Sequence, residues 1–213
     1  MRISVIVVAL VFSLVGCRYS LPDIQPQQLN VVSLDPANWY VFYSAGTPAN
    51  PSYDGIGAWS LAIPNAGGGG HLNYVQTPFV ATTTLHNVIM KFEVISTSPQ
   101  YVEIDPTDKL PATFRIFFEQ KNDDMESANG RWWADFDFHD LGSNDNQIIT
   151  ISVPFTWEQW GNVYGQQNAQ NFAAALANVG WIGMTFGGQY FAGHGVALNS
   201  GSATFDLIDF YVN

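Results

Sequence analysis

The chain of 213 residues is poor in cysteine and in basic residues. Cys17 is its only cysteine, so no disulfide can form within the chain. Lysine and arginine total 7 against 18 aspartates and glutamates, which gives a formal net charge of -11. This balance argues against nucleic acid and against anionic polymers as main partners, because like charges repel. A neutral polymer remains compatible with it.

The sequence also lacks the usual signatures of a catalytic site. No two of its histidines have the i, i+2 or i, i+4 spacing of a metal-ligand pair. No serine stands in a Gly-x-Ser-x-Gly elbow, and no cysteine is left for nucleophilic work. The stretch "FGGQYFAGHGV" lacks the lysine and the following helix of a phosphate loop. The glycine-rich loop at 187–196 is therefore not expected to be an active site.

Charge is scarce and aromatic residues are abundant. Charged residues make up 12% of the chain, and aromatic residues make up 15%. So many rings indicate either a thick aromatic core or stacking residues on the surface.

The N-terminal segment has the pattern of an export signal. Arg2 precedes an apolar stretch, 3–15, that is too short to span a bilayer comfortably. The stretch ends in "LVGC", which resembles the lipobox of bacterial lipoproteins, whose cysteine is lipidated. We therefore expect a signal peptide at 1–16, a tether at 17–30 with lipidation at Cys17, and a β-sandwich domain at 31–213. The alternative is an ordinary cleaved signal with a stray cysteine. On the lipoprotein interpretation, the protein is anchored in the bacterial cell envelope and faces outside the cytoplasm.

Short apolar runs separated by Gly, Pro and Asn clusters predict many strands of six to eight or so residues. Only "QNAQNFAAALANV" is typical of a helix, with Phe172, Leu176 and Val179 on one face. This pattern predicts an all-β fold, an antiparallel jelly-roll β-sandwich with one short helix.

Two predicted strands, "ATFRIFFEQ" and "RWWADFDFHD", each have one apolar face and one mixed face. The loop between them is short enough for a hairpin, so we expect the mixed faces to merge into one surface. Pyranose rings stack on tryptophan, and their hydroxyls need donors and acceptors. This surface therefore suggests carbohydrate binding, with Trp133 as the platform. The residues expected around it are Arg115, Glu119, Arg131, Asp135, Asp137 and His139. The alternative is a solvated sheet face with Trp133 half buried.

The loop at 187–196 carries a second set of candidates. Tyr190 or Phe191 would stack on a ligand, and His194 would donate a hydrogen bond, if the loop is a binding rim. The alternative is a structural turn whose glycines adopt positive φ angles.

The C-terminal third resembles a known group of folds. The order "ITISVPFTWEQWGNVYG", "FAAALANVGWIGMTFGG" and "ATFDLIDFYV" is similar to that of galactose-binding-like jelly rolls, which include carbohydrate-binding and laminin-B-like modules. The resemblance implies the fold more than the function. It also implies a structural calcium near Asp206 or Asp209, although "LIDF" departs from the usual "DNV" ending. No other cofactor is expected.

A catalytic alternative rests on Glu103-Ile104-Asp105, which resembles the E-x-D-x-x-E motif of jelly-roll β-glucanases. Alternation would place Glu103 and Asp105 on one face, as paired carboxylate chemistry requires. However, Pro106 breaks the strand, and Asp108 stands where the second glutamate should be.

The sequence thus predicts a non-catalytic carbohydrate-binding lipoprotein whose partner is a glycan and whose membrane contact is the lipid anchor. The alternatives are a glycoside hydrolase or lyase, and a structural envelope protein that binds another protein.

Overall fold

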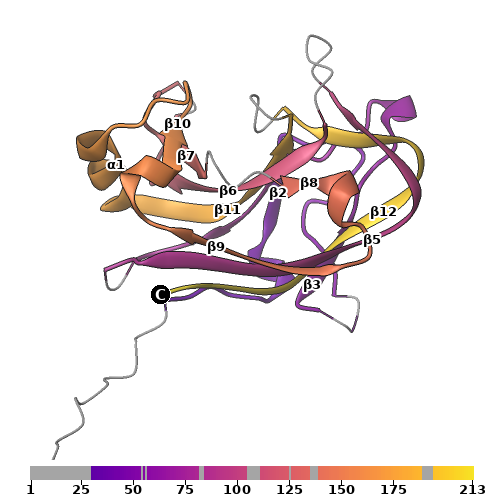
Figure 1. Cartoon of the computed structure of the whole chain (residues 1–213), viewed down its shortest axis with the longest axis horizontal. Coiled ribbons are helices and arrows are strands. Elements are labelled where there is room, and N and C mark those ends of the chain that lie inside the picture. Colours follow the sequence, from indigo (N-terminus) through magenta and orange to yellow (C-terminus); the bar gives the residue numbers. More distant parts are fainter. Residues whose placement is uncertain are drawn as a thin grey trace, which may run out of the picture.

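The computed structural model describes residues 30–53, 55, 57–81, 84–104, 111–124, 126–134, 139–188 and 194–213. Two antiparallel β-sheets lie face to face, and a short helix lies at one end of them (Figure 1). This confirms the predicted antiparallel β-sandwich with one short helix.

Several predicted features lie outside the described residues. They are the signal peptide, Cys17 and most of the tether, together with Asp105, Asp135, Asp137, Tyr190 and Phe191. Their assignments stay predictions.

The first sheet has five strands, and two long strands form its centre. In order across the sheet, the strands are β1 (Asn30–Val31), β12 (Val196–Val212), β5 (Asn87–Glu103) and β9 (Ile148–Pro154). The fifth, β3 (Trp59–Ala62), also pairs with β12.

The second sheet has seven strands. Across the sheet these are β10 (Trp160–Asn162), β7 (Arg131–Ala134), β6 (Thr113–Gln120), β11 (Val179–Gly187), β4 (Tyr74–Pro78) and β2 (Tyr40–Phe42). The seventh, β8 (His139–Asp140), pairs with β6.

In the described residues, one α-helix and four 3-10 turns connect the strands. The turns are η1 (Pro36–Asn38), η2 (Ala66–Gly68), η3 (Leu141–Asn144) and η4 (Trp157–Gln159). The helix, α1 (Ala169–Leu176), begins where the Asn168 side chain accepts a hydrogen bond from the Asn171 amide. Phe172 faces the core, but Val179 already belongs to β11. The predicted helical face is therefore wrong at its last residue.

Two strands are longer than the predicted six to eight or so residues: β5 and β12 have 17 residues each. They pair over almost their full length, with register shifts between Leu198 and Ser202 and again near Asp209. Such irregularities bend a long strand pair, which allows it to curve across the sandwich.

Many of the described aromatic side chains lie in the core between the two sheets. Trp39, Trp59, Trp132 and Trp160 are fully buried there. Phe92 stacks on Phe205 at a centroid distance of 5.3 Å. The aromatic residues thus form a thick core, and a second group of rings, including Tyr40, Phe42 and Tyr43, is exposed at the surface.

Candidate functional site

The predicted merging of two mixed strand faces is confirmed for Arg131 and Trp133 on the second strand. β6 and β7 pair antiparallel, with Phe117 opposite Trp133 and Glu119 opposite Arg131. Directly paired residues project from the same face of a sheet. Neighbouring residues such as Phe118 and Trp132 belong to the core between the sheets. The mixed side chains therefore lie on the outer face of the seven-stranded sheet.

The open tryptophan platform that the sequence suggested is not present on this face. Trp133 is only 6% exposed and packs with Tyr74 and Phe117. Its Nε1 donates a hydrogen bond to Thr185 Oγ1 at 2.9 Å. Arg115, on the same face, is also buried. In this structure Trp133 therefore stabilises a small outer core and presents no open ring face to a sugar.

His139 lies on the opposite face from the one predicted. β7 pairs Trp132 with Phe118, whereas β8 pairs His139 with Phe114. From Trp132 to His139 is seven residues along the chain, whereas their partners on β6, Phe118 and Phe114, are four residues apart. Seven and four differ by an odd number, so the alternation of side chains between the two faces is reversed at His139. The His139 ring consequently stacks on Phe114, with a centroid distance of 5.4 Å.

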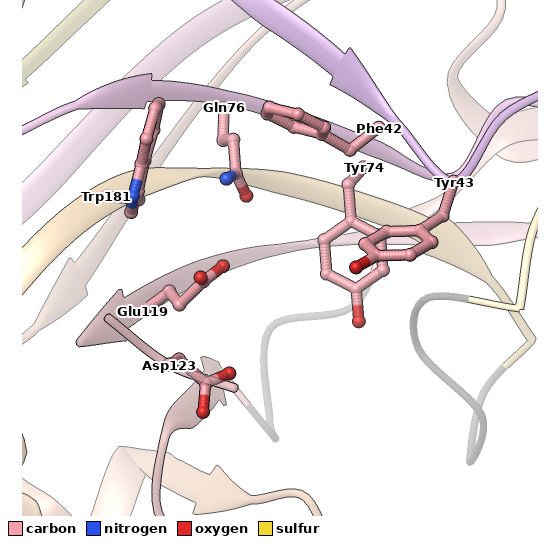
Figure 2. A pocket seen from close by; sticks show the side chains of 7 residues that line it. All are labelled: Phe42, Tyr43, Tyr74, Gln76, Glu119, Asp123 and Trp181. Atoms are coloured by element: carbon pink, nitrogen blue, oxygen red, sulfur yellow. The ribbon is translucent and has the colours of Figure 1, made fainter. Parts of the chain in front are cut away.

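An aromatic cavity lies on the outer face of the seven-stranded sheet. Cross-strand register places Tyr40 opposite Gln76, and Trp181 opposite Glu119. The cavity has a volume of about 170 Å³. Its lining residues are Phe42, Tyr43, Tyr74, Gln76, Glu119, Asp123 and Trp181 (Figure 2). Four different strands and two loop positions therefore contribute to one hollow.

The aromatic wall of this cavity is held by edge-to-face contacts. Phe42 and Trp181 meet with ring centroids 6.1 Å apart and planes at 85°. Tyr40 contacts both of these rings. Tyr43 packs edge-on against Tyr74 at 5.8 Å. Phe42 is 38% exposed and Tyr43 is 61% exposed. These rings thus offer the accessible aromatic surface that Trp133 does not.

A buried ion pair forms the base of the site. Arg131 Nε lies 2.9 Å from Asp123 Oδ2, and the Asp123 side chain is 0% exposed. Gly130 permits this approach, because a Cβ there would overlap the Asp123 carboxylate. The guanidinium also lies 5.9 Å from the centroid of Trp133 and hydrogen-bonds Tyr74. Burial raises the pKa of Tyr74, and Arg131 partly offsets this shift. The ion pair therefore connects the cavity to the outer core beneath it.

Glu119 is a carboxylate whose titration is strongly altered by its surroundings. Burial raises its pKa to about 7, and the nearby charge of Asp123 adds to the rise. Arg131 and a hydrogen bond from Gln76 act in the opposite direction. Figure 2 shows Glu119 and Gln76 near each other on the cavity wall. Glu119 can therefore donate a hydrogen bond when protonated, or carry a negative charge, near neutral pH.

This titration predicts how stability depends on pH. Between pH values of about 4.5 and 7 the folded chain holds a proton at Glu119 that the unfolded chain has released. The contribution of Glu119 to the unfolding free energy should therefore fall as pH rises through this window. Urea denaturation at pH 5 and pH 7.5 measures it. The wild type should lose more stability over this interval than Glu119→Gln, and parallel changes would contradict the raised pKa.

The end of the glycine-rich loop lies near the tyrosine edge of the cavity. Gly195 has φ +100° and packs against His71. The His71 ring hydrogen-bonds the Tyr43 carbonyl, with Nε2 and O 3.0 Å apart. His194 is exposed beside Gly195 but is not among the lining residues. A binding-rim role for this loop stays a prediction.

The remaining sequence candidates lie elsewhere. Glu103 is the last residue of β5. Its carboxylate packs so closely on Gly188 that a Cβ at that position would overlap it. Asp206 is buried in β12. Among the described residues, no three His, Cys, Asp or Glu side chains gather as a metal site would require. Within the same residues, no helix is long and apolar enough to cross a membrane.

The sequence reasoning missed the exposed rings of Tyr40, Phe42 and Tyr43 and the partly buried ring of Trp181. The segment "NWYVFYSA" did offer a signal, because Tyr40 and Phe42 share a face that alternation leaves outside the core. Nothing local indicated that Trp181, far along the chain, would complete the same wall.

Comparisons with known proteins give one distant structural likeness. No protein-family model and no curated protein matches the chain. A solved structure described as "xylan-binding module CBM15" is similar, with a TM-score of 0.42 and 16% sequence identity. The match covers 84% of this chain and 97% of that chain. A likeness this distant carries no argument about ligand or site residues.

Proposed function

We propose that this chain is a non-catalytic carbohydrate-binding protein and that the cavity on the seven-stranded sheet is its glycan site. The observation that carries the proposal is an accessible aromatic wall beside polar side chains. Phe42, Tyr43 and Trp181 offer ring surface to the apolar face of a sugar. Gln76 and Glu119 offer donors and acceptors for its hydroxyls.

The polar groups distinguish this proposal from the binding of an apolar protein surface. A protein-docking patch would be contiguous and apolar, without donors and acceptors at its centre. Here Gln76 and Glu119 stand between Trp181 and the tyrosines (Figure 2). The net charge of -11 favours a neutral or weakly charged glycan over an anionic one.

The arrangement of carboxylates supports binding over hydrolysis. Glycosidases need two carboxyl groups that both reach the scissile bond. Glu119 and Asp123 both line the cavity, but the Asp123 side chain is fully buried and paired with Arg131. Asp123 is therefore poorly placed to act on a bound sugar.

The lipid anchor is a separate part of the proposal and rests on the sequence. The apolar stretch that ends in "LVGC" supports export and lipidation at Cys17. Such an anchor would hold the glycan site at a membrane surface of the cell envelope that faces outside the cytoplasm.

The test is affinity electrophoresis of the protein through gels that contain xylan, mixed-linkage β-glucan, galactomannan or galactan. The wild type should be retarded by at least one of these polysaccharides. With that polysaccharide, Trp181→Ala should lose about 1–3 kcal/mol of binding free energy, or roughly 5- to 150-fold in Kd, because the stacking surface is removed.

Trp157→Ala is the matched control, because Trp157 is exposed on η4 and is not a lining residue. It should bind like the wild type, and melting curves should show that both variants are folded. Absence of retardation in every gel, or equal losses in the two variants, would refute the proposed site.

A further inference from the structure

The cavity combines aromatic rings with negative charge. Four rings line it, from Phe42, Tyr43, Tyr74 and Trp181. No basic side chain is among the seven described residues of the lining. The neighbouring guanidinium of Arg131 is held by Asp123 beneath the surface. The rings and Glu119 therefore face the hollow without a cation in the lining.

This combination is the chemistry of ammonium recognition. A cation within about 6 Å of an aromatic centroid is attracted by the negative ring face, and several rings together recognise methylated ammonium groups. A carboxylate at the same place adds a direct Coulomb attraction. A cavity of about 170 Å³ holds several water volumes of roughly 30 Å³ each, which is enough for one substituted ammonium group.

We propose that the cavity binds an ammonium group, with the rings around the cation and Glu119 as its counter-ion. The group would belong either to a small quaternary amine or to an amino-sugar unit of a glycan. This inference rests on the proposed function in using the same cavity, and it deepens that function by assigning the ligand a positive charge.

Binding of a cation should release a proton from Glu119. The charged and titratable groups around Glu119 are Asp123, Arg131 and Tyr74, and Tyr43 lines the same cavity. Burial and Asp123 keep the pKa of Glu119 at about 7 in the free protein. A cation beside it stabilises the carboxylate and lowers that pKa. If only the ionised form binds, affinity for a permanently charged ligand falls about 30-fold from pH 8 to pH 5.5.

The test is calorimetric titration of the full chain with choline and with its uncharged isostere 3,3-dimethyl-1-butanol. At pH 8 choline should bind at least about tenfold more tightly, because shape is shared and only charge differs. Glu119→Gln should abolish this preference and its pH dependence. The control Glu126→Gln changes an exposed carboxylate outside the lining and should behave like the wild type.

Equal binding of choline and its isostere, no binding of either, or an unchanged choline preference in Glu119→Gln would overturn the inference. A second arm compares chitosan oligosaccharides with their N-acetylated forms. Tighter binding of the free amine would identify an amino-sugar source, whereas a response to choline alone would identify a small-molecule source. Neutral polysaccharide binding without a choline preference would refute the ammonium site and leave the glycan proposal standing. A choline preference without any glycan binding would refute the glycan proposal and leave the ammonium site standing.

Discussion

Replacing Asp123 with alanine is expected to lower the free energy of unfolding by about 3–5 kcal/mol. The substitution leaves the buried guanidinium of Arg131 without the carboxylate that lies 2.9 Å from its Nε. Glu119, opposite Arg131 across the β6–β7 ladder, compensates in part. The pKa of Glu119 should therefore fall, because the charge that helps to raise it is gone. Urea denaturation measures the loss of stability.

Two further variants separate charge from packing. Asp123→Asn keeps the volume of the side chain and removes its charge, so it should be nearly as destabilising as alanine. The double variant Asp123→Leu with Arg131→Met removes both charges and should recover most of the lost stability, as buried ion pairs often do when both partners become apolar. A loss below about 1 kcal/mol for Asp123→Ala would mean that the pair is solvated and contributes little.

Trp132→Ala and Trp133→Ala are each expected to lose about 3–5 kcal/mol of stability, although the two side chains point to opposite faces. Trp132 is fully buried between the sheets and packs edge-on against Phe172 at 5.4 Å. Trp133 belongs to the outer core with Tyr74 and Phe117. Removing either indole leaves a cavity that its neighbours cannot fill. Thermal and urea denaturation of the two variants measure the effect.

Trp157→Ala again supplies the control, and its stability should change by less than about 1 kcal/mol because Trp157 is exposed. The value for Trp133 is the decisive one. An unchanged unfolding midpoint for Trp133→Ala would show that the outer face is open to solvent, and it would restore Trp133 as a candidate stacking platform.

Local alternation was sufficient to predict the sandwich and the two faces of its best-defined strands. Phe118 and Trp132 pack inside, while Phe117, Glu119 and Trp133 project outward. This part of the fold is predictable because side-chain direction in a strand depends only on the parity of sequence position. The same rule failed at His139, where extra residues between β7 and β8 reverse the parity.

The burial of an outward-facing residue was not predictable in this way. Trp133 lies on the predicted face, yet the ring of Phe117 stacks beside it and Arg131 lies over it. Whether such a face is open depends on what packs against it from other strands. The residues that pack against the face come from strands far apart in the sequence, so no local sequence pattern indicates the burial.

The composition and alternation of the sequence alone therefore determined an all-β chain whose best-defined strands have one apolar face and one mixed face. Only the tertiary structure decided where the outer sheet face forms a cavity. It brings Phe42 from β2, Gln76 from β4, Glu119 from β6 and Trp181 from β11 around one cavity. The physical reason is that strand order and register, which set neighbours across a sheet, arise from long-range pairing and core packing, whereas alternation arises from each strand by itself.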